Sequence, residues 1–200
     1  MCDLSKPIEK VESWDEYFYG ICRAVAANGK CFSRRIGAIL VRDKSVFSTG
    51  YNGPPRGVPP CDERWFHDIN LLEAYWDSLP DEDNARKADP NGDQFRAMVK
   101  GKCPRRILNI PSAEGIGWCP AGHAEENAVL NAARMGIETK GSAMYMTCGI
   151  PCVKCMVKII NAGVEELIVT SFSIYDQSTD YLLNTSDIKI RLYDFLAEKF

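Results

Sequence analysis

Two segments of this chain place metal-binding residue types at the predicted starts of helices. The first, GHAEENAVLNAARMG at 122–136, has His123 and Glu125 ahead of an apolar pattern of helical spacing. The second, Pro151-Cys152-Val153-Lys154-Cys155, opens another such pattern, and proline is favoured in the first turn of a helix. If both segments meet at one ion, the chain between them must fold back and bring two helix starts together.

The residue types in these segments match the ligands that zinc prefers. Zinc binds a neutral imidazole and cysteine thiolates in tetrahedral geometry, and a catalytic site leaves the fourth position for water. His123, Cys152 and Cys155 supply three ligands, and Glu125 is placed to face the fourth position as a general base and acid. Alone, the CxxC also fits a redox or structural site, and Glu125 also fits an ordinary acidic first turn. The combination is far more specific than either part.

Composition narrows the functional classes. The chain has 200 residues, a net charge of −3 and nine cysteines, an odd number. The negative charge argues against a surface that wraps a polyanion. We expect an intracellular, cytoplasmic protein, because the N-terminal residues form no apolar signal segment and no run is apolar enough to span a bilayer. In a reducing compartment, clustered cysteines favour metal ligation over disulfides.

The pattern along the chain predicts alternating strands and helices. Ser13 and Glu16 have the spacing of a capping box, and Asp43 and Lys44 lie between two β-rich runs of a predicted hairpin. This order implies an α/β sandwich with a sheet covered by helices. The expected helices cover 13–28, 124–135, 151–163 and 188–200, and the expected strands cover 36–41, 46–51, 143–147 and 167–170.

The middle of the chain breaks this pattern. Residues 58–118 are rich in Pro, Asp and Asn, with short helices expected at 63–78 and 92–100. Because so long a structureless loop is unusual inside a domain, we expect an inserted subdomain within one domain covering 1–200. Four spare ligands of zinc-preferred types lie within or beside this segment and predict a second, structural zinc or, alternatively, are free core thiols and a surface histidine. They are Cys61, His67, Cys103 and Cys119. The remaining cysteines, Cys2, Cys22, Cys31 and Cys148, are expected to be free thiols or small core residues.

Three stretches resemble the cytidine and deoxycytidylate deaminase family, in particular its dCMP deaminases of phage or bacterial type. They are SRRIGAILVRDKSVFSTGYNGPPRG at 33–57, GHAEENA at 122–128 and PCVKC at 151–155. The combination H-x-E with P-C-x-x-C is the signature of zinc deaminases. The resemblance implies a three-layer α/β/α sandwich with a mixed central sheet. It also implies zinc-dependent hydrolysis of dCMP to dUMP and ammonia.

The resemblance assigns roles to particular residues. His123, Cys152 and Cys155 would hold the zinc, and Glu125 would carry a proton from the attacking water to N3 of cytosine and later to the departing amine. The main-chain N–H of Ala124 would bind the pyrimidine carbonyl.

Further substrate contacts follow from the same resemblance. Asn52 would bind near the sugar, although Asn-Gly is also a turn signal by itself. Ser33, Arg34 and Arg35 are candidates for the 5′-phosphate, which suits the forked guanidinium; the sequence leaves open which arginine points inward. Tyr175 would lie against the base or, equally, in the core.

The family also implies regulation and assembly. We expect a homohexamer activated by dCTP with Mg²⁺ and inhibited by dTTP, with Gly53 and Arg56 near the effector. A 5-modified dCMP or dCTP is an open substrate choice. Two other functions compete: a tRNA or other nucleic-acid base deaminase, which would need a basic surface, and a non-catalytic, zinc-stabilised nucleotide-binding protein, against which Glu125 argues.

Overall fold

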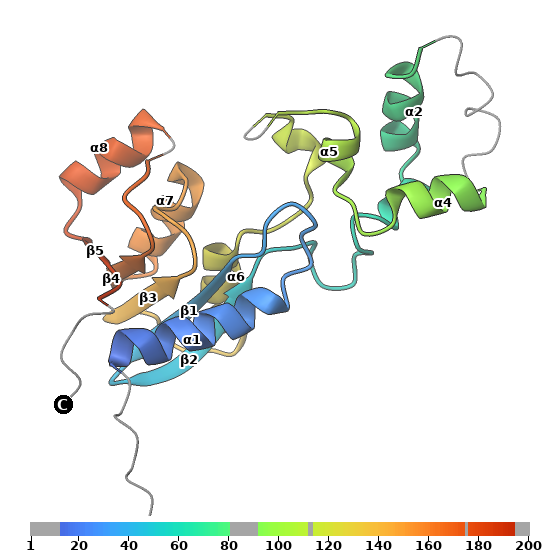
Figure 1. The fold of residues 1–200 in the computed structure, drawn as a ribbon. Coiled ribbons are helices and arrows are strands. Elements are labelled where there is room, and N and C mark those ends of the chain that lie inside the picture. The colour runs from blue at the N-terminus through green and yellow to red at the C-terminus, as the bar shows by residue number, and fades with distance from the viewer. Residues whose placement is uncertain (1–12, 81–91, 112–113, 175, 195–200) are drawn as a thin grey trace, which may run out of the picture.

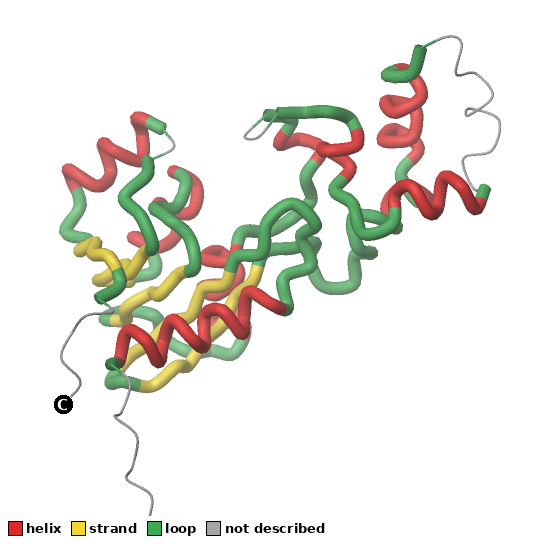
Figure 2. The backbone as a smooth tube through the Cα atoms, viewed as in Figure 1, coloured by secondary structure: helices red, strands yellow, loops and turns green. Residues whose placement is uncertain are grey.

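The computed structural model describes residues 13–80, 92–111, 114–174 and 176–194, and a five-stranded sheet lies at its centre (Figures 1 and 2). The strand order is β2-β1-β3-β4-β5. β1 runs antiparallel to β2 and β3, whereas β3, β4 and β5 are parallel, so the sheet is mixed as expected. The strands are β1 (Gly37–Arg42), β2 (Ser45–Tyr51), β3 (Ser142–Met146), β4 (Val164–Val169) and β5 (Lys189–Leu192).

Helices cover both faces of this sheet. Helix α1 (Trp14–Ala27) packs on one face through a cluster that includes Phe18 and Ile39. The other face carries α6 (Ala124–Arg134), α7 (Val153–Asn161) and α8 (Gln177–Thr185), whose cluster includes Leu40. Because neighbouring residues of β1 point to opposite faces, this strand contributes side chains to the apolar core on each face of the sheet. This arrangement confirms the predicted three-layer α/β/α sandwich.

Short-range contacts and turn geometry confirm the predicted first helix and the predicted hairpin that follows it. The Ser13 hydroxyl accepts a hydrogen bond from the Glu16 amide at 3.2 Å, and the Glu16 carboxylate accepts one from the Ser13 amide at 3.1 Å. This capping box starts α1. Asp43 and Lys44 have φ of 51° and 57°, as a two-residue hairpin turn requires, so the β1–β2 hairpin is confirmed.

The predicted C-terminal helix is wrong over the residues that the structure describes. Lys189–Leu192 forms β5, parallel to β4, and residues 195–200 lie outside the described ranges. The apolar residues Ile188, Ile190 and Leu192 also fit the two-residue period of a strand, and pairing with β4 decides between the two patterns. The helix that the sequence analysis missed is α8, which begins after Asp176, whose side chain accepts from the Thr179 amide.

The segment between β2 and α6 has an apolar core of its own. Figure 1 shows α2 and α4 extending away from the sheet, with α5 on the side nearer to it. The single helix expected at 63–78 is interrupted, because Asp68 caps a new helix by accepting from the Leu71 amide at 3.2 Å. The elements are η1 (Arg64–Phe66), α2 (Ile69–Asp77), α4 (Asp93–Val99), α5 (Pro104–Ile107) and η3 (Ile116–Trp118). The buried core residues are Trp65, Leu71, Leu72, Tyr75, Phe95 and Val99. No helix in the described ranges has the length and apolar character needed to cross a bilayer.

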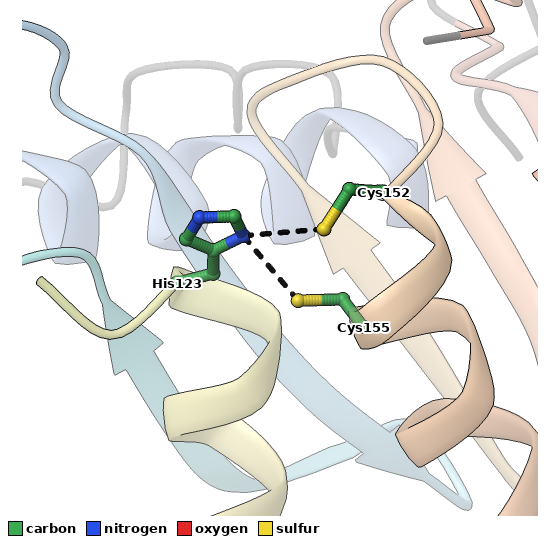
Figure 3. A group of neighbouring side chains, drawn as sticks. All are labelled: His123, Cys152 and Cys155. Carbon is green, nitrogen blue, oxygen red and sulfur yellow. Dashed lines mark hydrogen bonds between the residues drawn. The ribbon is translucent and has the colours of Figure 1, made fainter. Parts of the chain in front are cut away.

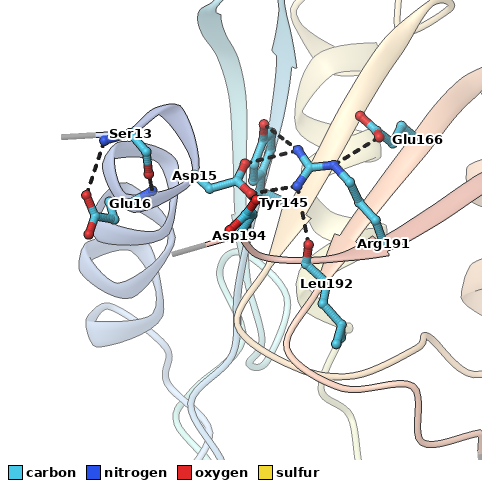
Figure 4. A network of polar contacts seen from close by, with 8 residues as sticks. All are labelled: Ser13, Asp15, Glu16, Tyr145, Glu166, Arg191, Leu192 and Asp194. Atoms are coloured by element: carbon cyan, nitrogen blue, oxygen red, sulfur yellow. Dashed lines mark hydrogen bonds and ion pairs between the residues drawn. The ribbon is translucent and has the colours of Figure 1, made fainter. Parts of the chain in front are cut away.

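A polar network joins α1 to the β5 edge of the sheet (Figure 4). The Arg191 guanidinium donates to both Asp15 carboxylate oxygens, at 2.6 and 3.0 Å, and to Glu166 at 3.1 Å. The Asp194 amide donates to Asp15 at 2.6 Å. Burial opposes the charge of Asp15, but the hydrogen bonds from Arg191 and Asp194 outweigh it and hold the pKa of this carboxyl below its usual value.

Asp15→Asn is expected to destabilise the fold by about 2 kcal/mol at pH 7, less than a fully buried pair would because the Arg191 side chain is 38% exposed. The lowered pKa means that the stabilisation is present above the unfolded-state pKa of about 3.9 and is lost as pH falls through the folded-state value. Denaturant unfolding at pH 7 and in acid checks both points. Glu165→Gln, an exposed change on β4, is the control. Equal unfolding free energies of Asp15→Asn and wild type at pH 7 would refute the assignment.

Candidate metal centre

Three predicted ligands meet where two helices begin (Figure 3). His123 is the N-cap of α6, Cys152 is the N-cap of α7, and Cys155 lies in the first turn of α7. The His123 Nδ1 atom lies 3.6 Å from the Cys152 sulfur and 3.4 Å from the Cys155 sulfur. All three ligand atoms fall within 4.8 Å of one another. The structure therefore brings together the ligand set that the sequence predicts.

These distances fit a tetrahedral zinc. Zn–N of about 2.0 Å and Zn–S of about 2.3 Å at a tetrahedral angle place the nitrogen and sulfur about 3.5 Å apart. Cys155 is buried, whereas the His123 side chain is 54% exposed. The group is thus closed on the protein side and open on the other, as a catalytic metal site requires.

Protonation within the group is strongly coupled. Hydrogen bonds that the protonated His123 ring donates to Cys152 and Glu125 raise the pKa of His123 to about 10. Hydrogen bonds from Cys155 and His123 lower the pKa of Cys152 to about 4, whereas the bond to Cys152 and burial raise that of Cys155. One thiolate is therefore already favoured, and zinc would displace the protons on the other two ligands.

Glu125 lies beside the three ligands and belongs to α6, not to α7, where the two cysteines lie. It is 4% exposed in the first turn of α6, and its carboxylate lies 3.6 Å from His123 Nδ1. Burial raises the pKa of Cys148 to about 12, and the Glu125 charge adds to this effect. A buried carboxylate at the mouth of the site is placed to carry protons for a bound substrate.

Close backbone packing holds α6, and with it His123 and Glu125, against β2. A Cβ atom at Gly50 would lie 2.2 Å from both the Ala124 oxygen and the Ala128 nitrogen. Two amide side chains of α6 also bind the edge strand: Asn127 donates to the Tyr51 oxygen and Asn131 to the Thr49 oxygen, each at 2.8 Å. The position of α6 thus depends on glycine at residue 50, because any Cβ atom there would collide with the helix backbone.

Gly50→Ala is expected to reduce the free energy of unfolding by about 1–3 kcal/mol, because α6 must move outward. Zinc affinity should fall as well, since the shift displaces His123. Thermal unfolding and a competitive zinc titration measure the two effects. Gly20→Ala is the matched control, because nothing lies within 4 Å of a Cβ there. Unchanged stability and zinc affinity in Gly50→Ala would contradict this packing argument.

The GYNG segment, residues 50–53, is hydrogen-bonded to the chain next to the metal centre. Gly53 and Gly122 exchange main-chain hydrogen bonds of 3.2 and 2.9 Å, directly before His123. The Asn52 side chain accepts from the Ile36 amide at 2.9 Å and donates to the Arg34 oxygen at 2.8 Å. Asn52 thus holds the segment before β1, a role that its turn-forming character did not reveal; its contact with substrate stays a prediction.

The two candidate arginines are alike in exposure, because both Arg34 and Arg35 lie at the surface. Burial raises the pKa of Cys148, and the charge of Arg34 acts against this effect. Which arginine binds the phosphate stays a prediction. Ala124 is the first residue of α6, so its N–H has no acceptor within the helix. Tyr175 lies outside the described residues.

Arg56, the other predicted effector residue besides Gly53, is hydrogen-bonded to a side chain of α6. Its guanidinium donates to the Asn131 side chain at 3.1 Å. The effector role of both residues stays a prediction.

The predicted second ligand set is not assembled. Among the residues that the structure describes, the side chains close enough to hold a metal are those of His123, Cys152 and Cys155. Burial raises the pKa of Cys61 to about 11, and charge repulsion from the thiols of Cys119, Cys103 and Cys31 adds to it. His67 is exposed and is not among the groups that act on Cys61.

Comparisons with known proteins agree with this site. Residues 12–171 match the family described as the cytidine and deoxycytidylate deaminase zinc-binding region. Deoxycytidylate deaminase of Schizosaccharomyces pombe is 30% identical over 191 residues, which is 96% of this chain and 47% of that protein. The enzyme of Mycobacterium phage D29 is 29% identical and is covered over 92% of its length, with 78% of this chain aligned.

The yeast relatives are longer than this chain. The chain spans about half the length of the enzymes from S. pombe and Saccharomyces cerevisiae that it matches. Among solved structures, dCMP deaminase from the cyanophage S-TIM5 in complex with dCMP and dUMP superposes with a TM-score of 0.54 at 18% identity. The match covers 88% of this chain and 94% of the phage protein, which confirms the fold.

Proposed function

This chain belongs to the cytidine and deoxycytidylate deaminase family, and we propose that it hydrolyses dCMP to dUMP and ammonia. The observation that carries the proposal is the meeting of His123, Cys152 and Cys155 at zinc-compatible distances beside the buried carboxylate of Glu125. The relatives named deoxycytidylate deaminase and the phage enzyme with dCMP and dUMP support this choice of substrate.

The chemistry divides between the metal and the protein. When bound by His123, Cys152 and Cys155, zinc supplies a Lewis acid that makes water a better nucleophile near neutral pH. Glu125 takes a proton from the attacking water and delivers it to N3 as oxygen adds to C4. Glu125 then takes the second proton from the oxygen added to C4 and passes it to the amine, which leaves as ammonia when the C4–N bond breaks and the C4 carbonyl forms. The N–H of Ala124 orients the ring through its carbonyl.

The segment before β1 is the proposed phosphate subsite. Its candidate residues are Ser33, Arg34 and Arg35, and both arginine side chains are exposed. Asn52 fixes the main chain at Arg34 and Ile36, so it positions this subsite as well as lying near the sugar.

We further propose a structural zinc held by Cys31, Cys61, Cys103 and Cys119. The charges of the other three thiols act on Cys61, Cys61 and Cys103 are buried, and the Ser33 amide donates to the Cys31 sulfur at 3.4 Å. A bound zinc would have to draw the four thiols together. Metal analysis of the purified protein should give two zinc ions per chain. Cys31→Ser should remove one and His67→Ala neither. Loss of a zinc in His67→Ala, or a single zinc in the wild type, would refute this ligand set.

Regulation, assembly and location stay predictions. A homohexamer, activation by dCTP with Mg²⁺, inhibition by dTTP and a cytoplasmic location rest on the family alone. Initial rates measured with and without each effector test the regulatory part, and a flat response would reject it.

A substrate screen tests the proposed activity. Zinc-loaded protein is incubated with dCMP, a 5-substituted dCMP, dCTP, deoxycytidine, cytidine and an RNA stem-loop that contains adenosine, and ammonia is measured. Release should be fastest from dCMP or its 5-substituted form. Release from the RNA alone, or from none of the cytosine compounds, would contradict the proposal.

A further inference from the structure

The loop that carries Cys152 to the metal centre rests on the segment that follows β4. Because β3 and β4 are parallel, both strands end at the same edge of the sheet. Beyond these ends the Thr170 amide donates to the Cys148 oxygen at 3.0 Å, which continues the pairing of the two strands. The first residues after β4 therefore lie directly against the loop 147–151, which leads into α7.

Gly149 makes a very close approach to this segment. A Cβ atom at Gly149 would lie 2.6 Å from the Ser171 hydroxyl oxygen, 3.1 Å from the Ser171 main-chain oxygen and 3.1 Å from the Ser173 hydroxyl oxygen. The two serine hydroxyls are hydrogen-bonded to each other at 2.8 Å, so neither can turn away without losing this bond. The φ of Gly149 lies outside the left-handed region, so its backbone would accept a side chain. Contact with the two serines is what excludes one.

The chain between Gly149 and the metal ligand is short and buried. Ile150 and Pro151 are both buried, and the proline ring fixes the φ of the residue directly before Cys152. Cys152 is the N-cap of α7, and its sulfur lies 3.6 Å from His123 Nδ1 (Figure 3). A shift of the backbone at Gly149 is thus passed through two packed residues to a ligand atom.

We infer that Gly149 is a positioning residue for the zinc ligand Cys152, seated on the hydroxyl pair of Ser171 and Ser173. The inference rests on the proposed function, because it concerns the metal centre at which deamination would take place. Residues around the ligands of a metal typically change its affinity by about 10–100-fold when they are altered. At Gly149 the effect is steric, because the absence of a side chain lets the loop lie close enough for Cys152 to reach the ion together with Cys155.

Zinc affinity, measured by competition with a chromogenic chelator, tests the inference without any turnover. Gly149→Ala should raise the zinc Kd about tenfold and Gly149→Val about a hundredfold, because the added carbons push the loop away from the serines. Gly20→Ala is the matched control, since a Cβ there meets nothing within 4 Å. Its Kd should stay within about twofold of wild type.

A second substitution tests whether the serine pair is the seat. Ser171→Ala removes the oxygen that lies closest to the added Cβ atom. In the Gly149→Ala background it should therefore recover most of the lost affinity, whereas alone it should change the Kd less than Gly149→Ala does. The two substitutions are then strongly non-additive, as expected for residues in contact. A double variant that binds zinc no better than Gly149→Ala would overturn the inference.

Cobalt absorption gives a readout that a general loss of stability would not change. In cobalt-loaded protein the sulfur-to-cobalt charge-transfer band grows with the number of bound thiolates, so Gly149→Val should lose about half of its intensity as Cys152 leaves the ion. A wild-type zinc Kd or an undiminished cobalt band in Gly149→Val would also overturn the inference. Should this variant not fold, Gly149→Ala and its double variant decide the question. Because the metal is titrated without substrate, wild-type protein that binds zinc but releases no ammonia from dCMP refutes the proposed function and not this inference.

Discussion

Glu125→Gln is expected to lower kcat for ammonia release from dCMP by a factor of about 10²–10⁴, the range that a positioned proton carrier contributes. Glutamine keeps the shape of the buried side chain but cannot accept a proton from water. Zinc should stay bound, because the three ligands are His123, Cys152 and Cys155. Steady-state kinetics and metal analysis of the same preparation measure both results.

The neighbouring residue provides the control for this variant. Glu126 lies in the same first turn of α6 but pairs with Lys158 on α7. Glu126→Gln therefore removes an equal charge beside the site without removing the proton carrier, and kcat should change by about twofold or less, as for an ordinary surface substitution. Near-normal turnover in Glu125→Gln, or loss of its zinc, would remove Glu125 from the proposed role.

Cys155→Ser is expected to lower zinc affinity by more than the roughly 10–100-fold that changes around a metal's ligands cause, because a ligand itself is lost. Cys155 is 2% exposed, so water cannot readily replace the missing sulfur from the protein side. Deamination of dCMP should disappear with the metal. Zinc titration against a chromogenic chelator measures the first effect, and an ammonia assay measures the second.

Cys22→Ser separates loss of this ligand from loss of any buried thiol. Cys22 is a fully buried residue of α1, on the opposite face of the sheet, and its sulfur donates to the Tyr145 oxygen at 3.3 Å. A serine hydroxyl can make the same contact, so zinc content and turnover should be kept. Cys155→Ser with wild-type zinc affinity would show that the three side chains do not form the metal site.

Several elements with local signals were predictable from the sequence, although α8 was missed despite its Asp176 cap, and the strand that depends on a distant partner was not predictable. Ser13 and Glu16 cap α1 by contacts within one turn, and Gly136 and Gly163 have positive φ after α6 and α7. By contrast, 188–192 fits either a helix or a strand, and only pairing with β4 makes it β5. Local hydrogen bonds decide the first kind, whereas tertiary packing decides the second.

The same distinction applies to the site. The ligands His123, Cys152 and Cys155 were predictable because each stands at a recognisable helix start, and the fold needs only one crossover to join them. The contact of α5 with the loop before β1 was not predictable, because the Arg106 guanidinium and the Ser33 oxygen that accepts its hydrogen bond are far apart in sequence.

The most direct test of the central claim is the conversion of dCMP by the zinc-loaded chain, followed by chromatography of the nucleotide and an assay of ammonia. We expect dUMP and ammonia in equal amounts, loss of the reaction when a chelator removes the metal, and recovery when zinc is returned. Unchanged dCMP in the presence of protein that holds zinc at His123, Cys152 and Cys155 would contradict the account.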